Sequence, residues 1–83
     1  MLVAKHRIDP KLTAEIGRKI YEERYRQSLE PTQNGKFLAI DVETGLASLG
    51  DNANQAMDAA RQAVPGGWYF LMRVGHPAAF VIY

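Results

Sequence analysis

The segment that most constrains this chain is residues 68–74, Trp-Tyr-Phe-Leu-Met-Arg-Val, in which only Arg73 is charged. Alternate side chains of a β-strand point to opposite faces of the sheet. Here both alternating sets are apolar or aromatic, with Arg73 as the exception. A strand of this kind is usually central in its sheet, or has its second face covered. The sequence therefore predicts a sheet that is built around this segment.

Chain length and composition limit the rest of the fold. The chain has 83 residues, of which 47% are hydrophobic, so we expect a single domain over residues 1–83. A domain of this size buries only about 60% of the surface that its unfolded chain exposes, so its core is thin. The absence of cysteine excludes disulfides, thiolate metal sites and cysteine nucleophiles. Because there are only two histidines as well, we expect neither a metal site nor a cofactor.

Capping and turn residues divide the chain into its other elements. Asp9 can accept hydrogen bonds from the first turn of a helix, and Pro10 has no N–H to leave unpaired there. This helix is expected to run to about Leu29 and to stop before Pro31. Similar signals predict a strand at 36–43, a returning strand at 46–49, a helix capped by Asp51 that ends at Val64, and a strand at 79–83.

The predicted order α-β-β-α-β-β indicates an α+β fold. We expect a two-layer sandwich, in which a mainly antiparallel four-stranded sheet carries two helices on one face. The other face would then expose an apolar patch, and such patches mark association surfaces. The alternative is that the first helix and the N-terminal residues wrap around the sheet and fill the gap. The patch would consist of Phe37, Ala39, Trp68, Phe70 and Tyr83.

The charge balance does not indicate a polyanionic partner. Ten basic residues face nine acidic residues, so the formal charge is +1 and no global basic field arises. No apolar run reaches the ~18 residues that a membrane span requires. The apolar residues 1–4 precede the basic residues 5–7, which is the wrong order for a signal peptide. We therefore expect a cytoplasmic bacterial protein with no membrane partner.

The polar residues do not form a catalytic set. His76 could act as a general base at a hairpin tip, but no Ser-His-Asp or Glu-rich spacing accompanies it, and a turn histidine that caps backbone groups is the simpler interpretation. Asp41 and Glu43 share one strand face near a hairpin tip, where carboxylates commonly stay in water. Arg73 either pairs with Asp41 across the sheet or projects as an anchor for a partner. We expect no enzymatic activity.

Two sets of residues are candidates for binding. Tyr21 and Tyr25, one helical turn apart, either pack against the sheet edge or form an aromatic handle in a protein interface. With them, the candidates for contact with a protein partner are Tyr21, Tyr25, Phe37, Trp68, Phe70, Arg73 and His76. A basic arm at residues 1–8 and the first helix are the candidates for contact with nucleic acid, although acidic residues interrupt them. This second set consists of Lys5, Arg7, Lys11 and Arg18.

Several short runs resemble known families. A family of short uncharacterised bacterial proteins is similar to this chain at Gly-Arg-Lys-Ile-Tyr-Glu (17–22), Gly-Lys-Phe-Leu-Ala-Ile-Asp (35–41), Thr-Gly (44–45), Gly-Asp (50–51) and Arg-Val-Gly-His-Pro-Ala-Ala (73–79). That resemblance spans about residues 16–80 and implies an architecture, but no activity and no site residue. The run Leu-Gly-Asp at 49–51, with Ala56, Ala60 and Ala63, is more weakly similar to HicB-like antitoxin domains. Here, however, a long helix comes first and no DNA-binding extension follows.

These observations predict a non-catalytic interaction protein. We expect it to form a homodimer through its sheet or its first helix, and to bind a protein partner in the manner of an antitoxin. The alternative is a small nucleic-acid-binding protein that uses the basic arm and the first helix.

Overall fold

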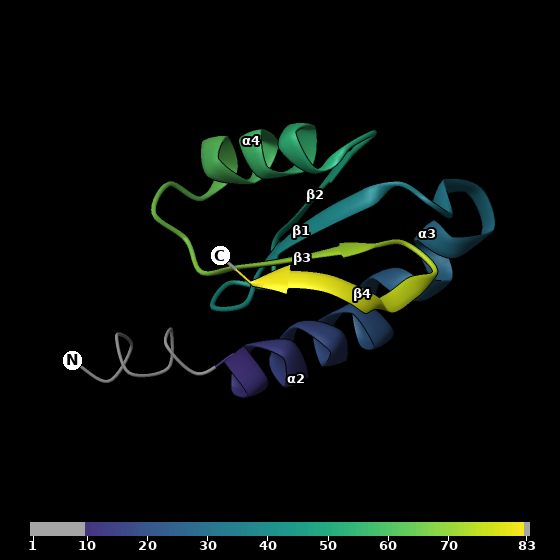
Figure 1. Cartoon of the computed structure of the whole chain (residues 1–83), viewed down its shortest axis with the longest axis horizontal. Helices are drawn as coiled ribbons and strands as arrows, with labels where there is room; N and C mark the ends of the chain where they lie inside the picture. Colours follow the sequence, from purple (N-terminus) through teal and green to yellow (C-terminus); the bar gives the residue numbers. More distant parts are fainter. Residues whose placement is uncertain (1–9, 83) are drawn as a thin grey trace.

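Three helical segments precede the sheet in the computed structural model, which describes residues 10–82 and the side chains of residues 10–76 (Figure 1). The predicted arm at 1–8, with Lys5 and Arg7, lies outside the described residues, as does Tyr83. The elements in chain order are α2 (Pro10–Ile20), the π-helix η1 (Tyr21–Tyr25), α3 (Arg26–Gln33), β1 (Phe37–Asp41), β2 (Ala47–Gly50), α4 (Ala53–Ala63), β3 (Tyr69–Arg73) and β4 (His76–Ile82).

The first helix departs from its prediction at both its middle and its end. Residues 21–25 widen into a π-helix, in which the Arg26 N–H bonds to the Tyr21 carbonyl. The helical path then continues through Pro31 to Gln33, although a helix end before Pro31 was expected. Glu30 accepts a 2.7 Å hydrogen bond from the buried Tyr21 hydroxyl. Pro31 has no backbone N–H, so the helix lacks one hydrogen bond there, and the bond between Tyr21 and Glu30 stabilises this last turn.

The predicted cap of the second helix is displaced by one residue. Asn52, not Asp51, is the N-cap of α4, and its side chain accepts a 2.9 Å hydrogen bond from the Gln55 N–H. Asp51 instead forms an ion pair with Lys36 at 3.3 Å. Both residue types can cap a helix, so the local sequence did not distinguish them.

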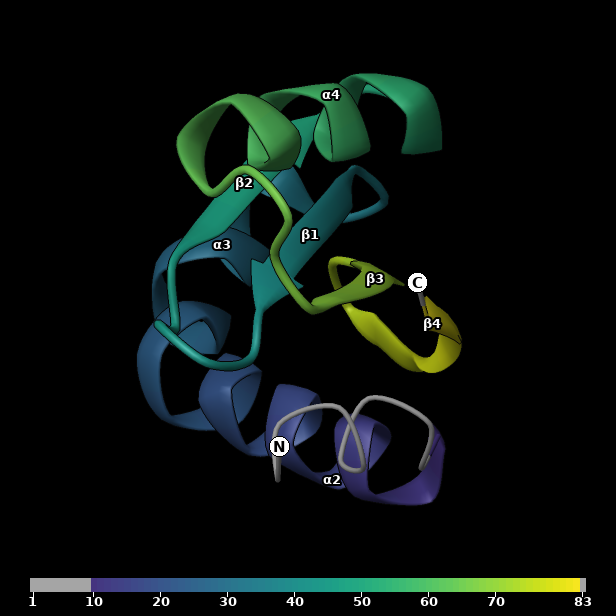
Figure 2. The same ribbon diagram turned by 90° about the vertical axis from the view of Figure 1, so that its left-hand side faces the viewer.

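The sheet has the strand order β2-β1-β3-β4, and all neighbouring strands are antiparallel (Figure 2). Leu38 pairs with Met72 and Ile40 with Phe70, so the apolar residues of β1 and β3 align on common faces. The interior position predicted for the segment 68–74 is confirmed, because β3 lies between β1 and β4.

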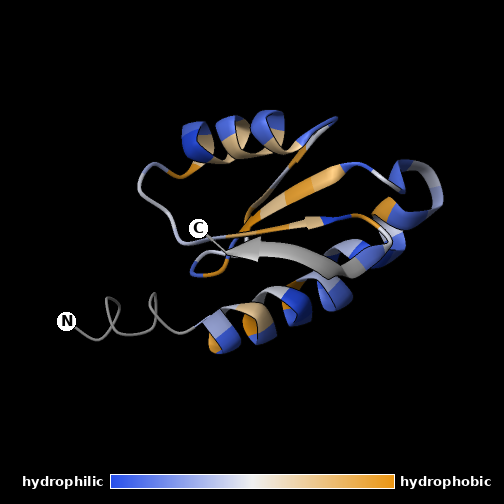
Figure 3. Cartoon of the chain, in the orientation of Figure 1, coloured by the Kyte–Doolittle hydropathy of each residue, from blue (hydrophilic) through white to orange (hydrophobic). Residues whose placement is uncertain are grey.

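Helices cover both faces of this sheet, so the predicted two-layer sandwich with helices on one face is wrong. The α2–η1–α3 rod lies on one side and α4 on the other, and the described residues before β1 form three helical segments instead of one (Figure 1). The physical reason is the composition of β3, which is apolar on both faces and requires a cover on each. Figure 3 shows apolar β1 and β3 between α4 and α2, both of which mix hydrophilic and hydrophobic residues.

Each face of the sheet has its own core. The first, under α2 and η1, includes Leu38, Ile40, Phe70 and Met72, and the second, under α4, includes Ala39, Met57 and Leu71. The α+β class therefore holds, but the predicted apolar patch is absent from the described residues. Ala39 and Phe70 are 0% exposed and Trp68 is 4% exposed, while Phe37 is partly buried against the second core.

Candidate functional site

The aromatic residues that we expected to bind a partner are mostly inside the protein. Trp68 and Phe70 belong to the first core, and the Trp68 indole N–H donates a 2.9 Å hydrogen bond to the Thr13 hydroxyl. Tyr21 is also fully buried. These three side chains stabilise the fold and do not form a surface that a partner can contact.

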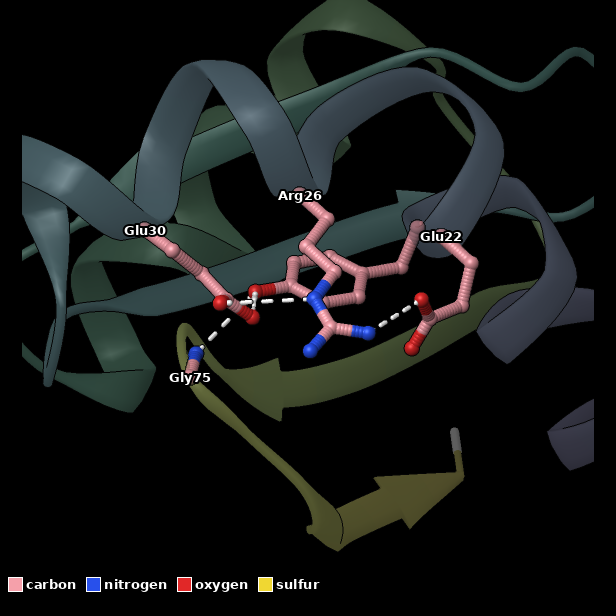
Figure 4. A network of polar contacts seen from close by, with 5 residues as sticks. Glu22, Arg26, Glu30 and Gly75 are labelled. Carbon is pink, nitrogen blue, oxygen red and sulfur yellow. Dashed lines mark hydrogen bonds and ion pairs between the residues drawn. The ribbon is translucent and has the colours of Figure 1, made fainter.

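Tyr21 and Tyr25 attach two turns of the sheet to the helical rod. The Tyr21 hydroxyl donates to Glu30 Oε2 at 2.7 Å and accepts from the Gly75 N–H at 3.0 Å (Figure 4). The Tyr25 hydroxyl donates to the Gly45 carbonyl at 2.6 Å. Gly75 lies in the β3–β4 turn and Gly45 in the β1–β2 turn, and both have positive φ angles. The two tyrosines thus bond turns of the sheet, and Tyr21 does so from within the core, whereas we expected packing against the sheet edge or an aromatic handle in an interface.

Burial, together with the hydrogen bond to Glu30, raises the pKa of Tyr21 to about 12. An unfolded tyrosine has a pKa of about 10, so between pH 10 and 12 the unfolded chain releases a proton that the folded chain keeps. We therefore expect this contribution to stability to be complete below pH 10 and to be lost progressively as the pH rises toward 12.

Urea unfolding of wild type and Tyr21→Phe across this range tests the expectation. At neutral pH the free energy of unfolding of the variant should be about 1–2 kcal/mol lower than that of wild type, because Glu30 and the Gly75 N–H lose their hydrogen-bond partner. Above pH 10 the difference between the two proteins should shrink. Parallel stability curves from neutral pH to pH 12 would show that Tyr21 does not titrate in this way.

An open polar groove of about 720 Å³ lies along η1 and α3. Inside it, Arg26 is held between Glu22 at 2.7 Å and Glu30 at 3.4 Å (Figure 4). The hydrogen bond that Arg26 donates to Glu22 is the main cause of a raised pKa for Arg26. Arg26 and Glu22 are about half exposed, and ion pairs of this kind contribute little free energy. The full lining consists of Glu22, Arg26, Gln27, Glu30, Pro31 and Asn34.

Asp41 is buried, which contradicts the expectation that it stays in water. Its side chain is 2% exposed and accepts hydrogen bonds from the Trp68 N–H (2.8 Å), the Thr44 N–H (2.9 Å) and the Thr44 hydroxyl (2.7 Å). Glu43 is exposed, as expected. Asp41 therefore ties the β1–β2 turn to the start of β3, and its buried oxygens are occupied by the fold.

The proposed pairing of Arg73 with Asp41 is wrong. Arg73 lies opposite Phe37 in the β1–β3 register, whereas Asp41 lies opposite Tyr69 at the other end of the ladder. The exposed Arg73 guanidinium instead lies 5.5 Å from the Phe37 ring centroid, which is a cation–π contact. Its Nε also donates to the Gly35 carbonyl at 3.4 Å.

His76 and the basic residues of α2 do not gather into a reactive site. His76 is exposed and begins β4. Lys11 and Arg18 are exposed on α2, with Glu15 between them in the chain, and the other two basic candidates lie outside the described residues. Within residues 10–82, the side chains described include no group of three His, Asp or Glu that could hold a metal ion. None of the helices described is long and apolar enough to cross a membrane.

The feature that sequence reasoning missed is the outer edge of β4. β4 spans seven residues and is the last strand of the sheet, and none of the other described elements lies beyond it (Figure 2). From Pro77 to Ile82 its sequence, Pro-Ala-Ala-Phe-Val-Ile, has no charged residue. We had predicted only residues 79–83 as a strand. The missed signal was the lack of charge between Pro77 and Ile82, whereas the edge position of β4 follows from the strand order.

The opposite edge of the sheet differs from this one. β2 has four residues and is followed immediately by Asp51, which pairs with Lys36. α4 packs so closely on it that a Cβ on Gly50 would lie 2.4 Å from the Ala56 nitrogen. Short length and adjacent charge are two of the ways in which proteins protect an edge strand from further pairing.

Comparison of the chain with protein-family models, with curated proteins and with solved structures finds no match.

Proposed function

We propose that this chain is a non-catalytic binding module whose docking element is the outer edge of β4. An extended segment of another polypeptide would add to the sheet at this edge and continue its hydrogen-bond ladder. The observation that carries the proposal is that the longest strand of the sheet is at its edge and has no charged residue between Pro77 and Ile82.

The chemistry of an edge strand supports this proposal. An edge strand has a row of backbone N–H and C=O groups on its outer side, and native proteins usually protect such a row with charges, bulges or short length. In β4 the protection is concentrated at one end, where Pro77 follows the irregular pairing near Arg73. The five residues 78–82 have no such device in their sequence.

The placement of the polar groups supports a non-catalytic role. The buried Asp41 carboxylate, the Tyr21 hydroxyl and the Thr13 hydroxyl each have a partner within the fold. The groove on α3 contains ion pairs that are open to solvent. A protein whose reactive groups are used for structure, and whose backbone has an open edge, is suited to binding.

A synthetic peptide with the sequence of residues 76–83, labelled at its N-terminus, serves as the extended probe. We expect saturable binding by fluorescence anisotropy to the full chain at low protein concentration. Ala79→Lys, which places a charge on the edge, should weaken this binding by at least about tenfold, or ~1.4 kcal/mol. The control Ala63→Lys, at the exposed end of α4, should bind like wild type. Absence of saturable binding to the wild-type chain would refute the proposal.

A further inference from the structure

We infer that the polypeptide accepted by β4 is β4 of a second copy of this chain, in a symmetric antiparallel dimer. The inference rests on the proposed function, because it needs the β4 edge to be the docking element. Beyond the proposed function, the inference specifies the partner, the symmetry of the dimer and the register of the two β4 strands. The product would be a continuous eight-stranded sheet, four strands from each copy.

Symmetry favours a second copy as the partner. Most soluble homo-oligomers are two-fold symmetric, and a two-fold interface brings the same surface of both subunits together. Two identical strand edges satisfy this condition when they run antiparallel, because the axis then exchanges the donors of one strand with the acceptors of the other. The sheet is already antiparallel at every pairing, so the added ladder would continue the existing pattern.

Charge also favours self-pairing at β4. Like charges directly opposite each other destabilise an antiparallel pair, and a symmetric pair places the residue on its axis beside its own copy. The segment 77–82 has no charged residue, so self-pairing brings no like charges together. The same operation at β2 would offer only four residues, with Asp51 directly beside them.

The ends of the strand fix the register. Pro77 has no N–H to donate, so the new ladder begins at Ala78, and β4 ends at Ile82. The longest antiparallel self-pairing of this stretch places Ala78 opposite the partner's Ile82 and Ala79 opposite the partner's Val81. Phe80 then lies on the two-fold axis. In Figure 2 β4 lies at the end of the sheet, with α4 above the sheet and α2 below it.

Sedimentation velocity over a concentration series tests the dimer. Wild type should change from monomer to dimer as the concentration rises from the micromolar to the millimolar range. Ala79→Lys should raise the dissociation constant by at least about tenfold, and Ala63→Lys should not change it. A wild-type chain that stays monomeric up to millimolar concentration would overturn the inference.

Disulfide trapping tests the register with milder substitutions. The chain has no cysteine, so single-cysteine variants report one position each. A mixture of Ala79→Cys and Val81→Cys should oxidise to the mixed disulfide in excess over either variant alone. Asn54→Cys, on the exposed side of α4, should not cross-link with either. Equal cross-linking through Asn54→Cys, or a dimer that is insensitive to both edge variants, would contradict the β4 interface.

The two proposals can fail separately. Peptide binding by a chain that remains monomeric refutes the second copy and retains the docking edge. A dimer that forms without peptide binding, and without trapping at positions 79 and 81, refutes both. If Ala79→Lys does not fold, as shown by its circular dichroism, the cysteine mixture decides the question.

Discussion

Replacing Asp41 by alanine is expected to lower the free energy of unfolding by about 3–5 kcal/mol, because the buried Trp68 N–H and the two part-buried donors of Thr44 lose their common acceptor. The variant leaves the Trp68 N–H, the Thr44 N–H and the Thr44 hydroxyl without the carboxylate that binds them. Small domains have a total stability of only about 5–15 kcal/mol, so a loss of this size brings the chain close to unfolding. Urea denaturation followed by circular dichroism measures the change.

A matched substitution separates this effect from the loss of a negative charge. Asp58 lies on α4, its side chain is 70% exposed, and it forms an i,i+3 ion pair with Arg61. Asp58→Ala should therefore cost less than about 1 kcal/mol. The free energy of unfolding of Asp41→Asn should lie between those of Asp41→Ala and Asp58→Ala. The asparagine side chain keeps one acceptor oxygen but places an amide NH₂ among hydrogen-bond donors. If Asp41→Ala costs no more than Asp58→Ala, the turn does not depend on this carboxylate.

Enlarging Gly17 is the second change with a large expected effect. A Cβ at this position would lie 2.4 Å from Phe70 Cγ, and Phe70 is 0% exposed. Gly17→Ala gains about 1 kcal/mol in helix propensity, but overcrowding of a packed core costs about 1–3 kcal/mol and occasionally more. Because the clash involves the base of a buried ring, we expect Gly17→Ala to lower the free energy of unfolding. Gly17→Val should lower it further.

A double mutant shows whether the clash with Phe70 is the cause. Phe70→Ala removes Cγ and Cδ2, the two ring atoms nearest to the added Cβ, so its cost in unfolding free energy should be smaller in the Gly17→Ala background than in wild type. Ser28→Val, at an exposed position of α3, is the control for adding bulk to the helical rod and should have little effect on stability. Additive costs for Gly17→Ala and Phe70→Ala would show that α2 does not approach β3 at this point.

The sequence was informative where side-chain periodicity decides the structure. Both alternating sets of residues 68–74 are apolar, which indicated a central strand or a covered second face, and β3 is interior. Within each strand the alternation also separated the faces correctly, with Leu38 and Ile40 apart from Ala39 and with Phe70 apart from Leu71. The predicted patch was wrong to place Ala39 on one face with Trp68 and Phe70, which lie in the other core. Periodicity shows which side chains share a face, because that depends only on the backbone geometry of the strand.

Periodicity did not show which element covers each face. A strand with two apolar faces is equally compatible with a second copy, a wrapped terminus or a helix on each side. The predicted uncovered patch is covered from both sides: α2 and η1 pack on Trp68 and Phe70, and α4 packs on Phe37 and Ala39 with Ala56, Met57 and Ala60. The direction in which a helix leaves a short connection is a property of tertiary packing and not of the local sequence.

The candidate site was missed because it is made of backbone. Aromatic and charged side chains attract attention as binding residues, yet Tyr21, Trp68 and Phe70 are used in the core. The open edge of β4 has no distinctive residue type; it follows from the strand order, which places β3 inside and β4 outside. Only the lack of charge between Pro77 and Ile82 was available in the sequence.

Amide hydrogen exchange of β4, measured by NMR at low and high protein concentration, tests the proposed edge most directly. At low concentration, the β4 amides that are not bonded to β3 should exchange quickly. Over residues 78–82 these amides should become protected as the concentration rises, while the outer amides of β2 should not change. If the outer amides of β4 exchange at the same rate at every concentration, β4 does not pair with another chain.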